Sequence, residues 1–361
     1  MDAALAQLTE QVLAARADKT VLDIRGAGSK AFYGGPVQGT PLDVRPLSGI
    51  SSYEPSELVV TARGGTPLAE LEAALAEKGQ CLPFEPPRFD AGSTVGGMVA
   101  AGLAGPARAA VGGVRDYVLG ATLLNGRAEV LSFGGQVIKN VAGYDLSRAL
   151  AGSMGVLGVV CEVSLKVLPV APATVTLRIE AEQGEAIRRV NQWGGQPLPL
   201  NASAWWDGVL VLRLSGAAAA VQAARSTMGG EIVEPALAQT FWTGLRDHCD
   251  EFFTGAQRAA EAGATLWRLS VPATTPPLKL SGEQLLEWGG AQRWICTTAP
   301  APLLREVAAA AGGHAVIFRS RDKSAGAFAP LKPPLDRIQR ELQRAFDPDG
   351  VFNAARLLTP A

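Results

Sequence analysis

The sequence is poor in residues that hold metals and disulfide bonds. Its 361 residues include two histidines and four cysteines, and Cys81, Cys161, Cys249 and Cys296 lie far apart without a C-x-x-C pair. This spacing excludes a ferredoxin-type cluster held by four thiolates, a mixed cysteine and histidine zinc site, and a disulfide framework in so long a chain. We therefore expect a reducing, cytosolic compartment.

Excess charge is missing too. The chain has 33 Lys and Arg against 34 Asp and Glu, so it lacks the basic surplus with which proteins neutralise nucleic-acid phosphates. The longest weakly polar stretch, 93–113, is rich in glycine and alanine and is interrupted by Pro106 and Arg108, so it fails as a membrane span. Asp2 argues against a signal peptide. We expect no nucleic-acid partner and no membrane span.

Hydrophobic residues, by contrast, make up 47% of the chain, enough for sizeable cores in about two domains. Short β-type runs alternate with helical patterns up to residue 170, and two prolines within 169–172 are typical of a linker. Beyond it an α+β pattern restarts, and all seven tryptophans lie there. The sequence predicts two domains, 1–170 and 171–361.

Several elements can be predicted from local patterns. We expect strands at 21–24 and 57–63 and an amphipathic helix at 67–78 that ends at Gly79. Asn125-Gly126 predicts a hairpin with a type I′ turn between strands 118–124 and 128–133. In the second half we expect a strand at 174–179, helices at 184–193 and 217–228, and a hairpin turned at Asp207-Gly208.

Three glycine-rich segments carry the strongest functional signal. The first, Arg25-Gly26-Ala27-Gly28-Ser29-Lys30, follows a predicted strand, and its glycines let backbone N–H groups turn inward around a phosphate. It lacks the third glycine of a dinucleotide fingerprint and the Gly-Lys-Ser/Thr end of a P-loop. Taken alone, it fits an ordinary strand-to-loop turn equally well.

The second segment, 90–102, places Gly92, Ser93, Thr94, Gly96 and Gly97 ahead of a helix of small residues. Its amides and hydroxyls suit an anion, and its small side chains let a flat ligand reach the backbone. Tight packing of that helix on a sheet is the alternative. The third segment, K-N-V-A-G-Y-D at 139–145, leads into G-S-M-G-V-L-G-V-V at 152–160.

In this order, the three segments resemble the FAD-binding domain of the FAD-linked oxidase superfamily, the PCMH or vanillyl-alcohol-oxidase type. The similarity covers about residues 20–170 and is strongest to the glycolate oxidase and D-lactate dehydrogenase branch, in particular to the FAD-binding accessory subunits of glycolate oxidases. It implies an α+β protein: a PCMH-type domain of two small α/β subdomains, then a smaller α+β domain with an antiparallel sheet and helices.

The resemblance implies one FAD. The first two segments would hold its pyrophosphate. The third segment and residues 115–120 would lie along the ribityl chain and the isoalloxazine ring. Ser29 and Thr94 occupy loops in which covalent members often carry His or Cys, so the FAD would be non-covalent. The implied cofactor-binding residues are Arg25, Gly26, Ala27, Gly28, Ser29, Lys30, Gly92, Ser93, Thr94, Gly96, Gly97, Asp116, Val118, Lys139, Asn140, Gly143, Tyr144, Asp145, Val159 and Val160.

The resemblance also implies a role in a complex. Catalytic 2-hydroxy-acid members carry an H-x-G-D-G-N-x-H motif and a G-S-E-G loop, whereas this chain has no such motif and reads Gly152-Ser153-Met154-Gly155. The end of the chain, F-D-P-D-G-V-F-N at 346–353, resembles a terminal family motif, but Ala354-Ala355-Arg356 replaces the usual P-G-R. No catalytic residue is assigned.

Accessory subunits of this kind accompany a catalytic flavoprotein subunit and an iron–sulfur subunit that together oxidise a small 2-hydroxy acid. The implied location is cytoplasmic, with contact to the inner membrane face only through partners. Two alternatives stay open. One is a stand-alone FAD oxidoreductase that acts on a small hydroxy acid, and the other is a structural partner that has the fold but no working flavin.

A few polar residues outside these segments are further candidates. His314 begins a predicted strand, where a hydrogen-bonded structural role is expected, and Arg319 and Arg321 would share one strand face that suits a carboxylate or solvent. His248, on a predicted helix, is expected at the surface. Lys139 and Tyr144 are stronger candidates, since the resemblance places them near the flavin, where a cation can stabilise the reduced ring; a helix-capping or packing role is the alternative.

Overall fold

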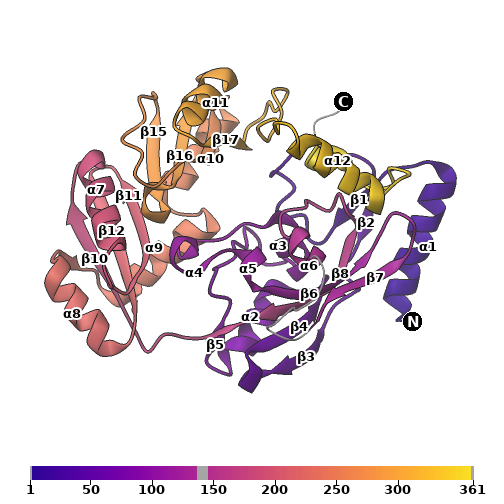
Figure 1. Cartoon of the computed structure of the whole chain (residues 1–361), viewed down its shortest axis with the longest axis horizontal. Helices are drawn as coiled ribbons and strands as arrows, with labels where there is room; N and C mark the ends of the chain where they lie inside the picture. The colour runs from indigo at the N-terminus through magenta and orange to yellow at the C-terminus, as the bar shows by residue number, and fades with distance from the viewer. Residues whose placement is uncertain (1, 136–144, 359–361) are drawn as a thin grey trace.

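The computed structural model describes residues 2–135 and 145–358, and its chain forms two α+β bodies side by side (Figure 1). The predicted site residues Lys139, Asn140, Gly143 and Tyr144 lie outside the described residues. A single connection leads from the first body into the second between β9 (Leu168–Pro169) and β10 (Ala173–Glu180).

The first body contains two sheets. In the smaller one, β1 (Leu22–Arg25) pairs in parallel with β2 (Thr40–Asp43) beside helix α1 (Ala3–Asp18). The larger sheet is antiparallel and has the order β3 (Ile50–Glu54), β4 (Val59–Arg63), β8 (Val159–Lys166), β6 (Val118–Leu124), β7 (Val130–Gly134). A short pair, β5 (Gln80–Cys81) with β9, closes this body toward the connection.

Strand β8 lies at the centre of the larger sheet and divides two cores. Val159 and Cys161 contribute to the core that α1 covers, whereas Val160 contributes to the core beneath α2 (Leu68–Ala76) and α3 (Val95–Ala101). Leu68, Leu71 and Leu75 of α2 are fully buried, at the spacing of one helical face. The expected amphipathic helix at 67–78 is therefore confirmed, and two cores of this kind match the expected subdomains.

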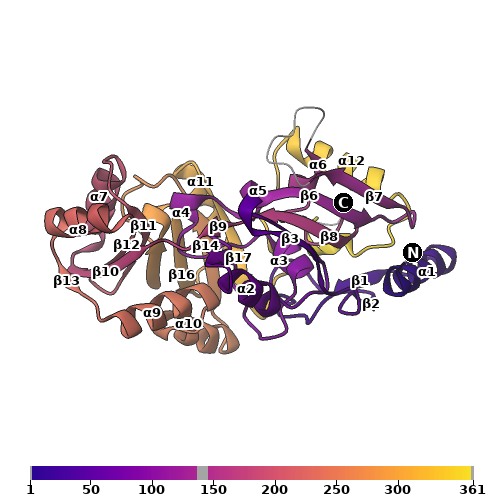
Figure 2. The same cartoon turned by 90° about the horizontal axis from the view of Figure 1, so that it is seen from below.

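The second body is one antiparallel sheet of eight strands, with helices on both faces. Figure 2 shows α9 (Pro235–Asp247) and α10 (Glu251–Glu261) on one face, and α7 (Gln183–Gly194), α8 (Ala218–Met228) and α11 (Ala301–Ala310) on the other. The strand order is β13 (Glu231–Ile232), β10, β12 (Val209–Gly216), β11 (Leu200–Trp206), β15 (Glu283–Glu287), β16 (Gln292–Thr297), β14 (Thr265–Ser270), β17 (His314–Arg319). The expected α+β class with an antiparallel sheet and helices is confirmed.

The two predicted hairpins had different outcomes. Asp207 and Gly208 both have positive φ, 45° and 77°, as a type I′ turn between β11 and β12 requires. The predicted hairpin between β6 and β7 is confirmed, but the prediction of a type I′ turn within it is wrong. The Asn125 amide bonds to the Glu129 carbonyl and Ala128 takes the positive φ of 63°, so the loop is longer than two residues. Gly126 is needed for another reason, because a Cβ there would collide with the Asp347 carboxylate.

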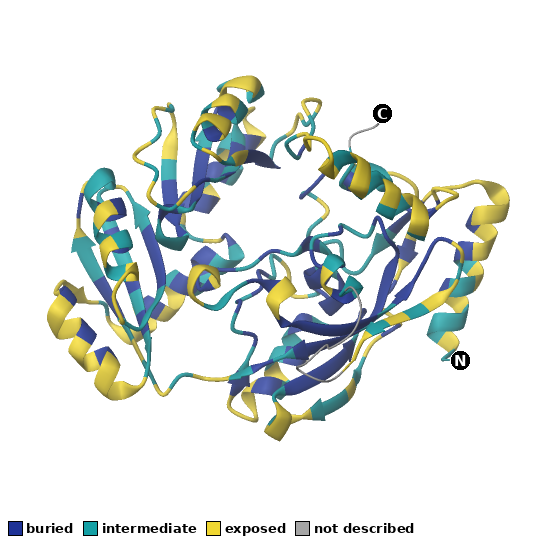
Figure 3. Ribbon diagram, viewed as in Figure 1, coloured by how far each residue is buried: buried dark blue, intermediate teal, exposed yellow. Residues whose placement is uncertain are grey.

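The end of the chain returns to the first body. After helix α12 (Leu335–Phe346), Val351 and Phe352 are buried in the α1 core, and Phe352 bridges to Leu22 of β1. Figure 3 shows that the interior strands of the first body are buried, whereas α12 is largely exposed. The division at residue 170 stays a prediction.

None of the helices in the described part of the chain is long and apolar enough to span a bilayer.

Candidate functional site

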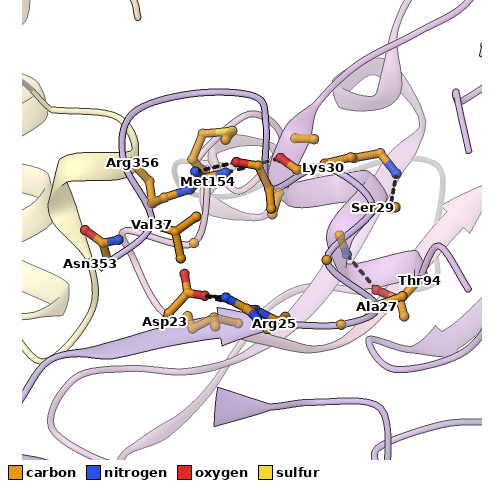
Figure 4. A pocket seen from close by; sticks show the side chains of 18 residues that line it. Asp23, Arg25, Ala27, Ser29, Lys30, Val37, Thr94, Met154, Asn353 and Arg356 are labelled. Atoms are coloured by element: carbon orange, nitrogen blue, oxygen red, sulfur yellow. Dashed lines mark hydrogen bonds and ion pairs between the residues drawn. The ribbon is translucent and has the colours of Figure 1, made fainter. Parts of the chain in front are cut away.

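The first two glycine-rich segments meet in one pocket beyond the end of β1 (Figure 4). The pocket is open to solvent, and the free space between its walls, counted together with the open solvent at its mouth, is about 710 Å³. Four parts of the chain form its wall. These are residues 23–31 with Val37, then Thr94, Gly97, Ala100 and Ala101, then Met154 and Gly155, and finally Asn353 and Arg356.

Small residues keep this pocket open and let its walls approach each other. A Cβ on Gly26 would collide with the Thr94 side chain, so glycine here permits the contact between the two segments. Gly28 has a φ of +75°, which glycine adopts without strain. Gly97 faces free space, where a Cβ would approach only the Thr94 hydroxyl, at 3.1 Å. The backbone is therefore exposed to whatever fills the pocket.

A partly buried cation lies at the side of this pocket. The Lys30 ammonium donates to Ser93 Oγ at 2.5 Å and to Ser29 Oγ at 3.4 Å, and burial lowers the pKa of Lys30 to about 8. Its hydrogen-bond partners are neutral hydroxyls, and no carboxylate of the described residues forms an ion pair with it. Asp247 and Asp90 act on the ammonium only from beyond ion-pair distance and raise its pKa against burial, so this position can still take an anion such as a phosphate.

Arg356 fastens the chain around the pocket. Its guanidinium donates to four backbone carbonyl oxygens, those of Lys30 (3.2 Å), Ala31 (3.0 Å), Tyr33 (2.6 Å) and Gly35 (2.6 Å). Each carbonyl belongs to the turn that continues the first segment, while Arg356 comes from the last described part of the chain. The side chain is itself buried. One residue thus fixes the path of the loop that forms the pocket wall.

Two further side chains hold the same loop. Asn353 donates from Nδ2 to the Pro36 carbonyl at 3.1 Å, and Lys323, beyond β17, donates to the carbonyls of Gly34 at 2.9 Å and of Phe32. Sequence reasoning missed these residues and Arg356 as parts of the site. The available signal was the terminal F-D-P-D-G-V-F-N motif, which ends at Asn353.

The structure gathers some of the predicted residues and disperses others. Arg25, Gly26, Ala27, Gly28, Ser29, Lys30, Thr94 and Gly97 line the pocket, and Ser93 lies behind it on Lys30. Gly92 is next to Ala27, since a Cβ on Gly92 would lie 2.9 Å from that of Ala27. Gly96 packs away from the pocket, with its amide bonded to the Gly64 carbonyl at 2.7 Å.

The remaining predicted residues have local structural contacts. Asp116 accepts from the Gly113 amide at 2.8 Å at the start of α5 (Val114–Tyr117). Asp145 caps α6 (Leu146–Ala149) and pairs with Arg148 at 2.8 Å. Val118, Val159 and Val160 are buried in strands β6 and β8. Their assignment to the cofactor stays a prediction.

His248 is not a surface residue, so that expectation is wrong. It ends α9 in the left-handed conformation, with φ at 56°, which turns its ring into an aromatic cluster. The imidazole stacks on Phe253, with ring centroids 3.7 Å apart, and meets the edge of Trp294 at 4.9 Å. Burial, then the nearby charges of Arg319 and Arg268, hold the pKa of His248 well below its usual value. The ring is therefore neutral at physiological pH.

Glu287 lies in the same interior and is also buried. Its Oε2 accepts from Trp294 Nε1 at 2.6 Å and from Gln292 Nε2 at 3.0 Å. Burial raises the pKa of Glu287 to about 7, although these two hydrogen bonds oppose the shift. Its carboxyl is therefore largely protonated below neutral pH.

The arginine pair proposed on the last strand does not form. Strand β17 ends at Arg319, and Arg321 is exposed beyond it, so the expectation of one shared strand face is wrong. The Arg319 guanidinium lies 3.5 Å from the centre of the Phe32 ring, which joins the second body to the pocket loop. Arg268 reinforces this contact by donating to Tyr33 Oη at 2.9 Å. His314 is exposed at the start of β17.

Comparison with known proteins provides the relatives of this chain. A family model described as an FAD binding domain matches residues 4–134. The chain is 49% identical over 350 residues to glycolate oxidase subunit GlcE of Escherichia coli K12, a match that covers 97% of this chain and 96% of that protein. It is 31% identical over 155 residues to glycolate oxidase subunit GlcD of Bacillus subtilis, covering 42% of this chain and 33% of that protein.

More distant similarity supports the same fold. A D-lactate dehydrogenase of Anaerostipes hadrus is 33% identical over 147 residues, or 41% of this chain and 30% of that protein. Two crystal forms of alkyldihydroxyacetonephosphate synthase superpose with TM-scores of 0.65 and 0.66, at 14% and 13% identity. They cover 95% and 96% of this chain, and 73% and 74% of the solved chains, so the architecture extends over both bodies.

Proposed function

Because this chain belongs to the family of the glycolate oxidase subunit GlcE, we propose that it is the FAD-carrying accessory subunit of a glycolate oxidase complex. FAD is its cofactor, and the protein is an FAD-dependent oxidoreductase subunit. In the proposed role it holds FAD non-covalently for electron transfer beside a catalytic flavoprotein subunit and an iron–sulfur subunit. The complex oxidises a small 2-hydroxy acid.

The observation that carries this proposal is the partly buried Lys30 ammonium beside exposed glycine backbone. A pyrophosphate placed there would accept hydrogen bonds from the Lys30 ammonium, the Ser29 hydroxyl and the backbone amides of the first segment. Arg25 is less suited to this role, because its guanidinium already pairs with Asp23 at 2.9 Å. When bound, the flavin supplies the electron-accepting and electron-donating chemistry, while the protein binds and orients it.

The lining of the pocket supports non-covalent binding. A covalent flavin link needs a nucleophilic side chain such as His or Cys, and the pocket wall contains neither. Ser29 and Thr94 are engaged in hydrogen bonds within the wall, with Ser93 and with the Gly97 amide. We therefore expect the cofactor to leave intact when the protein unfolds.

The second body supports an accessory role rather than direct oxidation of substrate. Removing a hydride from a 2-hydroxy acid needs a base for the hydroxyl proton and a cationic clamp for the carboxylate. His248 is enclosed by aromatic rings, Arg268 donates to Tyr33, and Arg319 stacks on Phe32, although its buried Nε has no hydrogen-bond partner in the described part of the chain. In the described ranges, 2–135 and 145–358, no three His, Cys, Asp or Glu side chains gather as metal ligands.

A single experiment tests this function. The FAD-loaded chain is mixed anaerobically with excess glycolate or D-lactate, alone and with the co-expressed flavoprotein and iron–sulfur subunits, and the flavin absorbance is followed. We expect the chain to stay oxidised alone and to become reduced in the complex. Rapid, complete bleaching of the isolated chain would establish a stand-alone enzyme instead, and a colourless chain that takes up no FAD would establish a structural partner.

A further inference from the structure

Helix α12 carries one apolar stripe that its own protein covers only in part. Leu335, Ile338, Leu342 and Phe346 follow one another at intervals of three or four residues and so share one side of the helix. Leu342 and Phe346 pack against the core beneath α2, and the Phe346 ring lies 6.0 Å from that of Phe133 on β7. Leu335 and Ile338 are 57% and 50% exposed.

The exposed apolar residues lie close together at the start of α12. Leu331, just before the helix, is 44% exposed, so three large apolar side chains are exposed within eight residues. No other stretch of eight described residues exposes more than two. Isolated exposed leucines are ordinary on a protein surface, whereas several large apolar side chains exposed in one short stretch typically mark a binding surface.

Charge indicates what covers this surface. The stretch 331–346 contains four basic and two acidic residues in a chain with a net charge of −1, and one acid, Glu341, already pairs with Arg337 at 3.6 Å. A second copy of the chain would oppose this basic rim with an identical one. A bilayer would need the whole apolar stripe, but its C-terminal half is packed on the protein. An acidic partner protein fits both the charge and the short patch.

The patch is also connected to the cofactor pocket. Phe346, the last residue of α12, accepts from the Gly126 amide at 3.0 Å, and the Asp347 carboxylate accepts from the amides of Val351 and Phe352 at 2.8 and 2.9 Å. Asn353, next in the chain, lines the pocket. A protein bound on α12 would therefore rest on the segment that frames the flavin site.

We propose that the face formed by Leu331, Leu335 and Ile338, with its basic rim, docks an acidic and apolar surface of a partner subunit that exchanges electrons with the flavin. This inference rests on the proposed function. The exposed start of α12 would then form the contact that assembles the complex. The packed C-terminal half of the helix would fix the position of this contact relative to the cofactor.

The test uses the tagged full chain co-expressed with the catalytic flavoprotein subunit and the iron–sulfur subunit. The variant Leu335→Asp/Ile338→Asp is compared with Leu237→Asp/Leu303→Asp, whose leucines are 65% and 42% exposed on α9 and α11. We expect the α12 variant to keep wild-type bound FAD and melting temperature and to lose about tenfold or more of the assembled complex. The control pair should assemble as the wild type does.

A milder variant, Arg337→Glu/Arg344→Glu, guards against misfolding because both side chains are exposed. We expect it to weaken assembly as well, most strongly at low salt. Normal assembly by both α12 variants would overturn the docking site. If the α12 variants assembled normally but no longer bound anionic phospholipid vesicles that the wild type binds, the docking site would also be overturned, and the face would be assigned to a membrane. Failure of the wild-type chain to assemble would instead overturn the proposed function.

Discussion

The cofactor pocket of the first body and the polar interior of the second body use burial in opposite ways. In the pocket, burial lowers the pKa of Lys30 and leaves its ammonium beside hydroxyls and bare backbone, ready for an anion. In the second body, burial keeps His248 neutral and Glu287 largely protonated among aromatic rings. The first arrangement leaves its cation open to a ligand, whereas the second encloses its groups among aromatic rings, with His248 Nδ1 and Gln292 Oε1 left without a hydrogen-bond partner among the described residues.

The difference lies mainly in side-chain size. Glycine and alanine line the pocket, so free space remains and the polar groups at its wall can reach a bound molecule. Phe253, Trp294 and Phe318 surround the interior of the second body, so its polar groups are packed among bulky aromatic rings. Substitutions in the pocket should therefore change cofactor binding, whereas those in the aromatic interior should change stability.

The largest effect on the pocket should come from Arg356→Gln. Glutamine cannot serve the four carbonyls that Arg356 holds, so the loop at 30–35 loses its fastening and buried carbonyls lose partners. We expect FAD affinity to fall about 100-fold or more and unfolding free energy to fall by roughly 2–4 kcal/mol. Titration of the apoprotein with FAD and a denaturant melt measure both. Arg344→Gln, exposed on α12, should change neither, and normal FAD binding by Arg356→Gln would refute the role of this clamp.

Gly97→Leu should empty the pocket while leaving the fold intact. Its side chain would project into free space that the flavin needs, and leucine favours the helix in which Gly97 lies. We expect FAD content after purification to drop to a few per cent of wild type, roughly a 30- to 100-fold loss of affinity, with a melting temperature close to that of the apoprotein. Gly194→Leu, which meets no neighbour, serves as the matched control. Full FAD occupancy in the Gly97 variant would place the cofactor elsewhere.

Glu287→Gln should stabilise the second body, but only above acidic pH. The folded pKa of Glu287 is raised to about 7, so its stabilising contribution is complete below the unfolded pKa of 4.5 and is lost as pH rises toward 7. Glutamine keeps an oxygen for Trp294 and Gln292 and cannot ionise. At pH 8 we expect the variant to be more stable by roughly 3 kcal/mol, and at pH 4 to match the wild type. Denaturant melts at both pH values measure this, and a difference that does not change with pH would contradict it.

Lys30 should give FAD binding a modest pH dependence. Its ammonium, with a pKa of about 8 before the ligand binds, is needed for the anion and loses its proton as pH rises. We expect the dissociation constant of FAD to be flat below about pH 8 and to rise up to about tenfold per pH unit above it. In Lys30→Met the affinity should be lower and independent of pH in that window. A wild-type profile that stays flat to pH 10 would remove Lys30 from the anion site.

Local sequence rules predicted the pocket wall but not its fastening. Arg25-Gly26-Ala27-Gly28-Ser29-Lys30 could be identified because glycine and hydroxyl residues after a strand have few other uses. Arg356 could not be identified by such rules, since its partners are backbone carbonyls more than 320 residues earlier, and any residue type can supply a carbonyl. The Lys139 to Tyr144 part of the site stays a prediction.

The two hairpins and His248 show the same limit. Asp207-Gly208 obeys the rule for its dipeptide because no described side chain presses on that turn: a Cβ on Gly208 meets no neighbour, and its carbonyl accepts only from the Ala181 amide at 2.9 Å. Asn125-Gly126 departs from the rule because Asp347 packs against Gly126 from a distant part of the chain. His248 was assigned to the surface because the helix pattern does not reveal that α9 ends there and turns its ring inward.

The return of the chain end to the first body also sets an order of events during synthesis. Ala31 and Arg356 are 325 residues apart, so at about 5–20 residues per second the pocket loop is made roughly 15–65 s before the side chain that fastens it. The entire second body is translated in that interval. FAD should therefore be taken up only once Arg356 has been made, and ribosome-bound chains that stop before Asn353 should carry no flavin.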